Sequence, residues 1–129
     1  MKTKILIIED HVAIRQALKD YLQSDHLNFE IYDAASGEEG IILAQKVKPD
    51  IVVMDFILPG QNGLQTAGKI KSFIPNCNMI LLTLFNRELF TEIMATHDIM
   101  AVIEKGKIYD ELGPAIKKCL KRNTHICPA

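Results

Sequence analysis

Five short apolar runs recur along the chain, separated by stretches with helical spacing. The runs cover residues 5–8, 29–32, 51–54, 80–82 and 100–103. Those at 5–8 and 51–54 are uninterrupted and rich in β-branched residues, which is typical of strands buried on both faces of a parallel sheet. The run at 29–32 alternates weakly and indicates a more exposed edge strand. The pattern therefore predicts five strands, of which the second is the most exposed.

The segments that follow the runs have apolar residues three and four positions apart, as on one face of a helix. Ser36 and Glu39 have the spacing of a capping box at a helix start. Because proline is tolerated only in a first turn, Pro114 places the start of the last helix close before it. Helices are predicted after Asp10, after Ser36, from Gly63, after Asn86 and from near Asp110.

Alternating strands and helices of these lengths predict an α/β fold with a doubly wound parallel sheet and helices on both faces. The arrangement expected is the flavodoxin-like one, with five strands in the order 2-1-3-4-5. Residues 1–122 are expected to form one domain, and residues 123–129 a tail or the start of a linker.

The composition is that of an ordinary globular domain. The 129 residues are 48% hydrophobic and 24% charged, and the net charge is -1. This charge gives no electrostatic reason to expect binding of nucleic acid or a membrane by this domain. No apolar run approaches the roughly 20 residues that span a bilayer. Cys77, Cys119 and Cys127 lack disulfide or metal-site spacing, so reduced thiols and a cytoplasmic location are expected.

Acidic residues stand where two of the buried strands end. Glu9 and Asp10 follow the first strand, and Asp55 closes the third. In the expected strand order these strands are neighbours at the switch point, so the three carboxylates crowd one crevice. Two bare carboxylates 4 Å apart repel by about 4 kcal/mol at an effective dielectric near 20. Three of them require a cation, and oxygen ligands with room for water suit Mg²⁺.

Thr83 and Lys105 end the fourth and fifth apolar runs and complete this edge of the sheet. An aspartate beside Mg²⁺ and a lysine is a good nucleophile toward phosphorus, and no glycine-rich nucleotide loop is present to shield it. Phosphoryl transfer asks for alignment and charge neutralisation, which Lys105, the Thr83 hydroxyl and the metal would supply. The expected product is an aspartyl-phosphate on Asp55.

This set of residues resembles the receiver domains of bacterial two-component response regulators over essentially the whole chain. The matching stretches are Ile8-Glu9-Asp10, Val53 to Gly60 with Asn62-Gly63, Leu82-Thr83, and Glu104-Lys105. The resemblance implies a signalling switch, not a metabolic enzyme, which catalyses only its own phosphorylation and dephosphorylation.

The resemblance also implies roles for single residues and for partners. Asp55 would take its phosphoryl group from a phosphohistidine on a sensor histidine kinase, and Thr83 and Lys105 would respond. Asp10 and Asp55 would bind Mg²⁺ directly, Glu9 through water, and Ile57 through its backbone carbonyl. Phosphorylation can drive homodimerisation in such proteins. Asp10-His11 and Leu58-Pro59-Gly60 are most similar to receivers that precede a LuxR-type helix-turn-helix, so DNA would be bound only through an output domain outside this chain.

Three positions depart from the family pattern: Val102, Leu84, and Gly106, which follows Lys105 where the family commonly has a proline after a cis peptide, so a trans bond is expected. Val102 replaces the usual Tyr or Phe three residues before the lysine, which puts switching by rotation of an aromatic ring in doubt. Leu84 follows Thr83 where a small residue is usual and narrows access to the site. In the family, side chains at the positions of Ile57 and Phe85 flank the water that removes the phosphoryl group. Because both are apolar here, a long-lived phosphorylated form is expected.

Two alternative functions stay open. A haloacid-dehalogenase-like phosphatase also uses an Asp nucleophile and Mg²⁺, but it requires a second Asp at the position of Ile57. A pseudo-receiver would bind partners without phosphorylation, and Val102 and Leu84 leave this alternative open. His11, His26, His97 and His125 lack metal-ligand spacing and are predicted to be surface residues.

Overall fold

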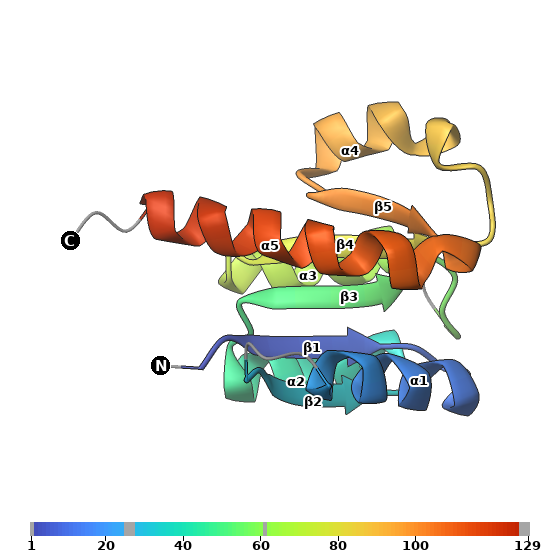
Figure 1. The fold of residues 1–129 in the computed structure, drawn as a ribbon. Coiled ribbons are helices and arrows are strands. Elements are labelled where there is room, and N and C mark those ends of the chain that lie inside the picture. Colours follow the sequence, from blue (N-terminus) through green and yellow to red (C-terminus); the bar gives the residue numbers. More distant parts are fainter. Residues whose placement is uncertain (1, 25–27, 61, 127–129) are drawn as a thin grey trace.

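The computed structural model describes residues 2–24, 28–60 and 62–126. It shows one five-stranded parallel sheet between two layers of helices (Figure 1). The strands are β1 (Lys4–Ile8), β2 (Glu30–Ala34), β3 (Ile51–Asp55), β4 (Asn78–Thr83) and β5 (Ala101–Glu104). Their order is β2-β1-β3-β4-β5, which confirms the predicted doubly wound topology and leaves β2 at an edge.

The helices divide between the two faces of the sheet. They are α1 (Val12–Gln23), α2 (Gly37–Val47), α3 (Gly63–Phe73), the 3-10 helix η1 (Arg87–Phe90) with α4 (Thr91–His97), the 3-10 turn η2 (Lys105–Lys107) and α5 (Ile108–Ile126). Residues of α1 and α5 pack against one apolar cluster. Residues of α2, α3, η1 and α4 pack against the other. Right-handed crossovers of a doubly wound sheet produce this division.

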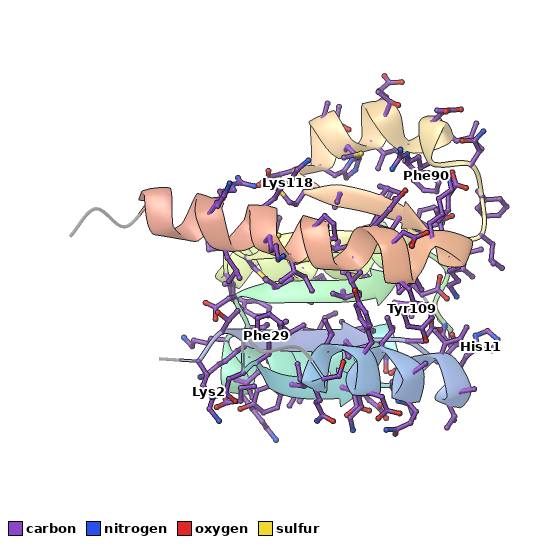
Figure 2. The ribbon with its side chains drawn as sticks, in the orientation of Figure 1. Lys2, His11, Phe29, Phe90, Tyr109 and Lys118 are labelled. Carbon is purple, nitrogen blue, oxygen red and sulfur yellow. The ribbon has the colours of Figure 1, made fainter. Side chains whose placement is uncertain are left out.

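Each sheet face takes alternate residues of the same strand, as the pleat requires. Ile5 and Ile7 of β1 face α1 and α5, whereas Leu6 and Ile8 face α2 and α3. All five residues of β3 are buried, which explains why its sequence shows no alternation. In Figure 2 charged side-chain ends lie around the outside of the molecule, and carbon fills the space between sheet and helices.

Local capping bonds explain where α2 and α3 begin. The Ser36 hydroxyl accepts from the Glu39 amide at 3.2 Å, and the Glu39 carboxylate accepts from the Ala35 amide, one residue before the position that a capping box uses. At α3 the box is complete, because Asn62 and Gln65 bond reciprocally.

Two predicted helix starts are corrected by the structure. Asn86 caps η1, where its Oδ1 accepts from the Glu88 amide at 3.1 Å, and α4 begins only at Thr91. The last helix begins at Ile108 and contains Pro114 in its interior. Burial of its apolar face against the sheet outweighs the backbone hydrogen bond that the proline removes.

The last helix also extends past the expected domain boundary. The backbone of α5 is helical to Ile126, so four of the seven residues expected to form a tail continue the helix. The physical reason lies in the sequence, where no proline or glycine follows Pro114 until Pro128. Residues 127–129, with Cys127, lie outside the described residues.

Two expectations from the sequence concern the cysteine thiols and membrane-spanning segments. Cys77 and Cys119 are free and buried, and burial raises the pKa of their thiols to about 12 and about 11. Across residues 2–24, 28–60 and 62–126, no helix has both the length and the apolar character needed to cross a bilayer.

At Gly63 the start of α3 packs closely against the end of β3. A Cβ on Gly63 would lie 2.8 Å from the backbone oxygen of Asp55 and 3.0 Å from Cα of Phe56. Because backbone cannot move aside cheaply, Gly63→Ala should destabilise the fold by about 1–3 kcal/mol. A Cβ on Gly68 of the same helix meets nothing within 4 Å. Gly68→Ala should therefore stabilise it by about 0.5–1 kcal/mol.

Urea denaturation followed by far-UV circular dichroism measures both free energies of unfolding. Equal effects of the two substitutions would contradict the close fit between Gly63 and Asp55.

Candidate functional site

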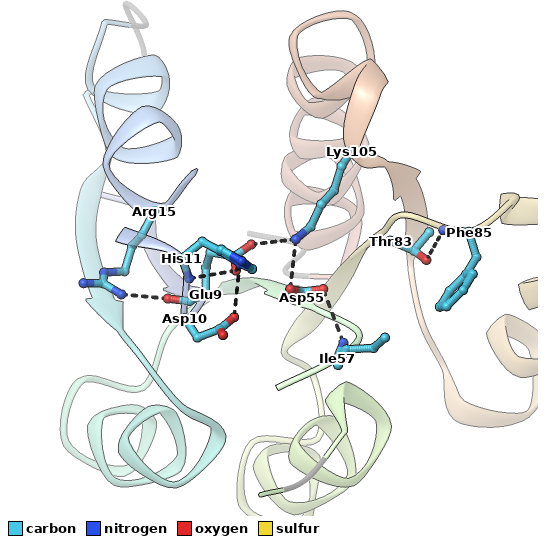
Figure 3. Close-up of polar contacts among 9 residues, drawn as sticks. All are labelled: Glu9, Asp10, His11, Arg15, Asp55, Ile57, Thr83, Phe85 and Lys105. Atoms are coloured by element: carbon cyan, nitrogen blue, oxygen red, sulfur yellow. Dashed lines mark hydrogen bonds and ion pairs between the residues drawn. The ribbon is translucent and has the colours of Figure 1, made fainter. Parts of the chain in front are cut away.

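The candidate site lies where β1 and β3 end side by side. Ile8 stands opposite Met54 in their parallel register, so the residues that follow, Glu9 and Asp55, meet at the carboxyl edge of the sheet. The chain then runs to α1 on one face and α3 on the other. This divergence makes the crevice where α/β proteins of this topology bind ligands. Figure 3 shows Glu9, Asp10 and Asp55 together at this edge.

Lys105 brings a positive charge into this group of acids. It follows β5, and its Nζ lies 2.9 Å from Asp55 Oδ2 and 3.2 Å from Glu9 Oε1 (Figure 3). Burial lowers the pKa of Lys105, but the hydrogen bond to Asp55 and the charge of Glu9 outweigh burial and raise the pKa above its usual value. The ammonium group is therefore protonated at neutral pH and shared by two carboxylates.

Glu9 is the most deeply buried acid of the site. Its side chain is 0% exposed, and its Oε2 accepts a hydrogen bond from the His11 amide at 3.2 Å. Burial raises the pKa of Glu9, with a further contribution from the charge of Asp55, although the His11 amide and Lys105 favour the ionised form. A carboxylate in this position gains from any additional cation nearby.

Among the described residues, two buried side-chain oxygens accept no hydrogen bond, and both belong to this site. They are Glu9 Oε1, which touches Lys105 only as an ion pair, and Asp10 Oδ1. Ligand atoms of Glu9, Asp10, His11 and Asp55 all lie within 4.8 Å of one another. Three carboxylates against one ammonium leave the charge that one divalent cation would balance. The residues present therefore fit a divalent metal ion.

Ile57 contacts the acceptor candidate through its backbone. Its amide donates to Asp55 Oδ1 at 3.3 Å, and Ile57 forms an isolated bridge with Asn62 that closes the turn before α3. The turn passes through Gly60, whose φ of 80° suits glycine. The predicted role of the Ile57 carbonyl as a metal ligand stays a prediction.

Thr83 ends β4 beside this group but is engaged elsewhere. It is buried, and its Oγ1 accepts from the Phe85 amide at 2.9 Å (Figure 3). Within the described residues no hydrogen bond links it to Asp55. The structure therefore brings Glu9, Asp10 and Asp55 together, pairs Lys105 with Glu9 and Asp55, and places Thr83 at the end of the neighbouring strand.

Sequence reasoning missed two residues that touch the site. His11 is 65% exposed, as a surface residue should be, but its Nδ1 lies 3.4 Å from Glu9 Oε2 and 3.6 Å from Asp10 Oδ1. Arg15 donates from Nη1 to the backbone oxygen of Glu9 at 2.8 Å, and its Nε pairs with Asp33 at 3.0 Å. The signal that could have found His11 is its place directly after the acidic pair.

The departures from the family pattern have a structural setting. Val102 is buried beside a cavity of about 230 Å³, which is also lined by Met100 and Pro114. Arg87 crosses this region, because its amide donates to Glu104 at 3.1 Å and its Nη1 to Glu111 at 3.0 Å.

Three apolar side chains stand exposed on the two loops beside Asp55. Ile57 is 57%, Leu84 82% and Phe85 47% exposed. The Leu84 side chain is thus mostly in solvent, so the narrowing of the site expected from it stays a prediction.

Comparison with known proteins agrees with this geometry. Residues 5–117 match the family model described as the response regulator receiver domain. The response regulator protein VraR of Staphylococcus aureus (strain NCTC 8325 / PS 47) is 28% identical over 120 residues, which are 92% of this chain and 56% of that protein. The chain thus spans about half the length of the curated relatives it matches.

Solved structures show the same similarity. A DNA-binding response regulator of the LuxR family from Staphylococcus aureus has a TM-score of 0.80 at 30% identity, covering 91% of this chain and 98% of that chain. A response regulator receiver domain protein from Clostridium thermocellum has a TM-score of 0.88 at 24% identity, covering 97% of this chain and 99% of that chain. The latter likeness concerns the fold alone. With its family model matched over residues 5–117, the chain belongs to the receiver domains of two-component response regulators.

Proposed function

We propose that Asp55 is the phospho-acceptor of this receiver domain and that a sensor histidine kinase is the donor. The observation that carries the proposal is the position of Asp55. It ends a buried strand at the switch point, bonded to Lys105 at 2.9 Å and beside acidic oxygens that accept no hydrogen bond. Attack by a carboxylate oxygen forms the P–O bond as the P–N bond to the kinase histidine breaks, and the imidazole leaves.

The residues of this chain align and neutralise the transferred group. Asp10 and Asp55, with Glu9 through water and the Ile57 carbonyl, would hold Mg²⁺, which when bound supplies positive charge to the phosphoryl oxygens. The Lys105 ammonium, which now donates to the Asp55 carboxylate, would donate instead to a phosphoryl oxygen. The Thr83 hydroxyl, whose oxygen accepts from the Phe85 amide, would donate its own proton to another phosphoryl oxygen.

The partners proposed follow from the family and its relatives. We place the exchange in the cytoplasm, with homodimerisation as one response to phosphorylation. The matched relatives include LuxR-family regulators described as DNA-binding, so DNA would be reached through an output domain that lies outside residues 1–129.

The other two candidate functions find less support. A haloacid-dehalogenase-like phosphatase requires an Asp where this chain has Ile57, and the family match is to receivers. A pseudo-receiver is disfavoured because Asp10, Asp55 and Lys105 are all present, with Asp10 close to Asp55 and Lys105 paired with Asp55. Incubation with acetyl phosphate and Mg²⁺ followed by intact-mass measurement tests the proposal, since only a phospho-acceptor gains the mass of one phosphoryl group.

Asp55→Asn should abolish this mass gain and leave the fold intact. The amide is nearly isosteric, and it removes one of the two carboxylates that share the Lys105 ammonium. The melting temperature without Mg²⁺ should therefore hold or rise. Asp20→Asn, on the exposed side of α1, is the matched control and should label like the natural chain. Labelling that persists in Asp55→Asn would show that the acceptor lies elsewhere.

Lys105→Ala should leave Mg²⁺ binding largely in place but uncouple phosphorylation from any change in association. The lost contact is a charge-assisted hydrogen bond, worth about 1.5–3 kcal/mol. Lys107→Ala removes an exposed lysine from the same turn and serves as the control. Calorimetry measures metal binding, and light scattering with and without acetyl phosphate measures association. Phosphorylation-dependent association that survives in Lys105→Ala counts against this role.

The phosphorylated form should be long-lived, because the exposed side chains of Ile57 and Phe85 cannot hold an attacking water by hydrogen bond. Changing Ile57→Asn and Phe85→Glu together should speed hydrolysis by at least about tenfold, or about 1.4 kcal/mol of barrier. Leu89→Asn, another exposed apolar position, should change nothing. The measurement is loss of the phosphoryl mass after removal of acetyl phosphate. Decay of the natural phosphorylated chain within seconds would be the contrary result.

A further inference from the structure

His11 places an imidazole nitrogen at the edge of the acidic site. Its Nδ1 lies 3.4 Å from Glu9 Oε2 and 3.6 Å from Asp10 Oδ1. Figure 3 shows the ring beside the carboxylates of Glu9 and Asp10. The ring therefore belongs to the set of groups that could contact a bound cation.

The backbone holds His11 in this position. His11 is the N-cap residue of α1, and its carbonyl accepts from the Arg15 amide at 2.9 Å. Its amide is committed to Glu9 Oε2 at 3.2 Å, which folds the turn back over the acid pair. The side chain makes no capping bond, so the helix does not require the imidazole. The ring is free to serve the acidic site.

A second observation shows that the positive charge of Lys105 does not satisfy all the acidic oxygens of this site. Glu9 is completely buried, yet its Oε1 accepts no hydrogen bond, and the same holds for the buried Asp10 Oδ1. Lys105 pairs with Glu9 and Asp55, and within the part of the chain that the structure describes no ion pair links it to Asp10. A cation would therefore stabilise the cluster most on the side that carries Asp10 and His11.

The spacing of these atoms is that of metal ligands. With bonds near 2.1 Å, neighbouring ligand atoms lie about 3.0 Å apart in an octahedron and about 3.4 Å apart in a tetrahedron. The two distances from His11 Nδ1, 3.4 and 3.6 Å, are close to these values. All separations in the group are within 4.8 Å, so a contraction of at most about 0.6 Å brings the widest pair to an octahedral diagonal of about 4.2 Å.

We infer that His11 Nδ1 is a metal ligand and that it gives this site a preference for first-row transition-metal dications over Mg²⁺. This inference rests on the proposed function, since it concerns the cation of the same acidic site. Mg²⁺ is bound through oxygen and retains its water, whereas imidazole suits nickel, zinc and related ions. Replacing one bound water by an imidazole therefore raises the affinity for Mn²⁺, Ni²⁺ and Zn²⁺ but not the affinity for Mg²⁺.

The preference has a direct consequence for the signalling reaction. Affinity of a mixed nitrogen and oxygen site rises along the series from Mn²⁺ to Ni²⁺. The cation present during phosphoryl transfer then depends on the supply of these ions as well as on Mg²⁺. A site of oxygen ligands alone would discriminate less between Mg²⁺ and these ions.

The first test measures the selectivity for metals of the untagged chain. Calorimetry gives the Kd of Mg²⁺ and of Ni²⁺ for the natural chain, His11→Asn and the control His97→Asn, which removes an exposed imidazole on α4. The ratio of the Mg²⁺ Kd to the Ni²⁺ Kd should fall at least about tenfold in His11→Asn, since even outer partners of a ligand contribute 10–100-fold. It should not change in His97→Asn. An unchanged ratio in His11→Asn, or an equal fall in the control, overturns the inference.

The second test detects the nitrogen itself. Pulsed electron paramagnetic resonance of the Mn²⁺-loaded chain should show coupling to an imidazole nitrogen, and the coupling should disappear in His11→Asn and persist in His97→Asn. A spectrum of oxygen ligands alone in the natural chain overturns the inference. Labelling of the natural chain by acetyl phosphate with Mg²⁺, measured in parallel, tells this failure apart from a failure of the proposed function.

Discussion

The repulsion among three neighbouring carboxylates, held together against a single ammonium group, is the constraint on which this structure depends. Glu9, Asp10 and Asp55 are brought together by the ends of two paired strands, and Lys105 balances only part of their charge. At the effective dielectric of a protein each close pair opposes folding by a few kcal/mol. The hydrophobic layers on both sides of the sheet must supply that free energy. The same repulsion among the carboxylates makes the site receptive to cations.

The fold supplies this energy through the same elements that position the site. β1 and β3 are buried on both faces, so their ends cannot move apart without exposing apolar surface on two layers. The close approach of Gly63 to the Asp55 backbone fixes the first turn of α3 against Asp55. Arg15 ties the Glu9 backbone to Asp33 of the edge strand. The contacts that stabilise the core therefore also hold the geometry of the site.

Much of this could be predicted from the sequence, because the signals are local. Continuous apolar runs identify strands buried on both faces, and acids at their ends must share an edge once the strand order is known. The start of α5 could not be predicted in this way, since packing of Ile108 and Leu112 against the sheet outweighs the local effect of Pro114. The contacts of His11 and Arg15 were missed because they depend on how one turn folds back over Glu9.

Val102 changes what a movement at Thr83 can do. No aromatic ring stands at this position to turn, and a cavity of about 230 Å³ lies beside it. Thr83 instead holds the Phe85 amide, and two residues later Arg87 bonds to Glu104 and Glu111. A shift of the hydroxyl toward Asp55 must either draw this strip of backbone along or forfeit a hydrogen bond worth about 0.5–1.5 kcal/mol. Under the proposed function, a movement of Thr83 would therefore act on the main chain between Phe85 and Arg87, which borders the half-open pocket beside Val102.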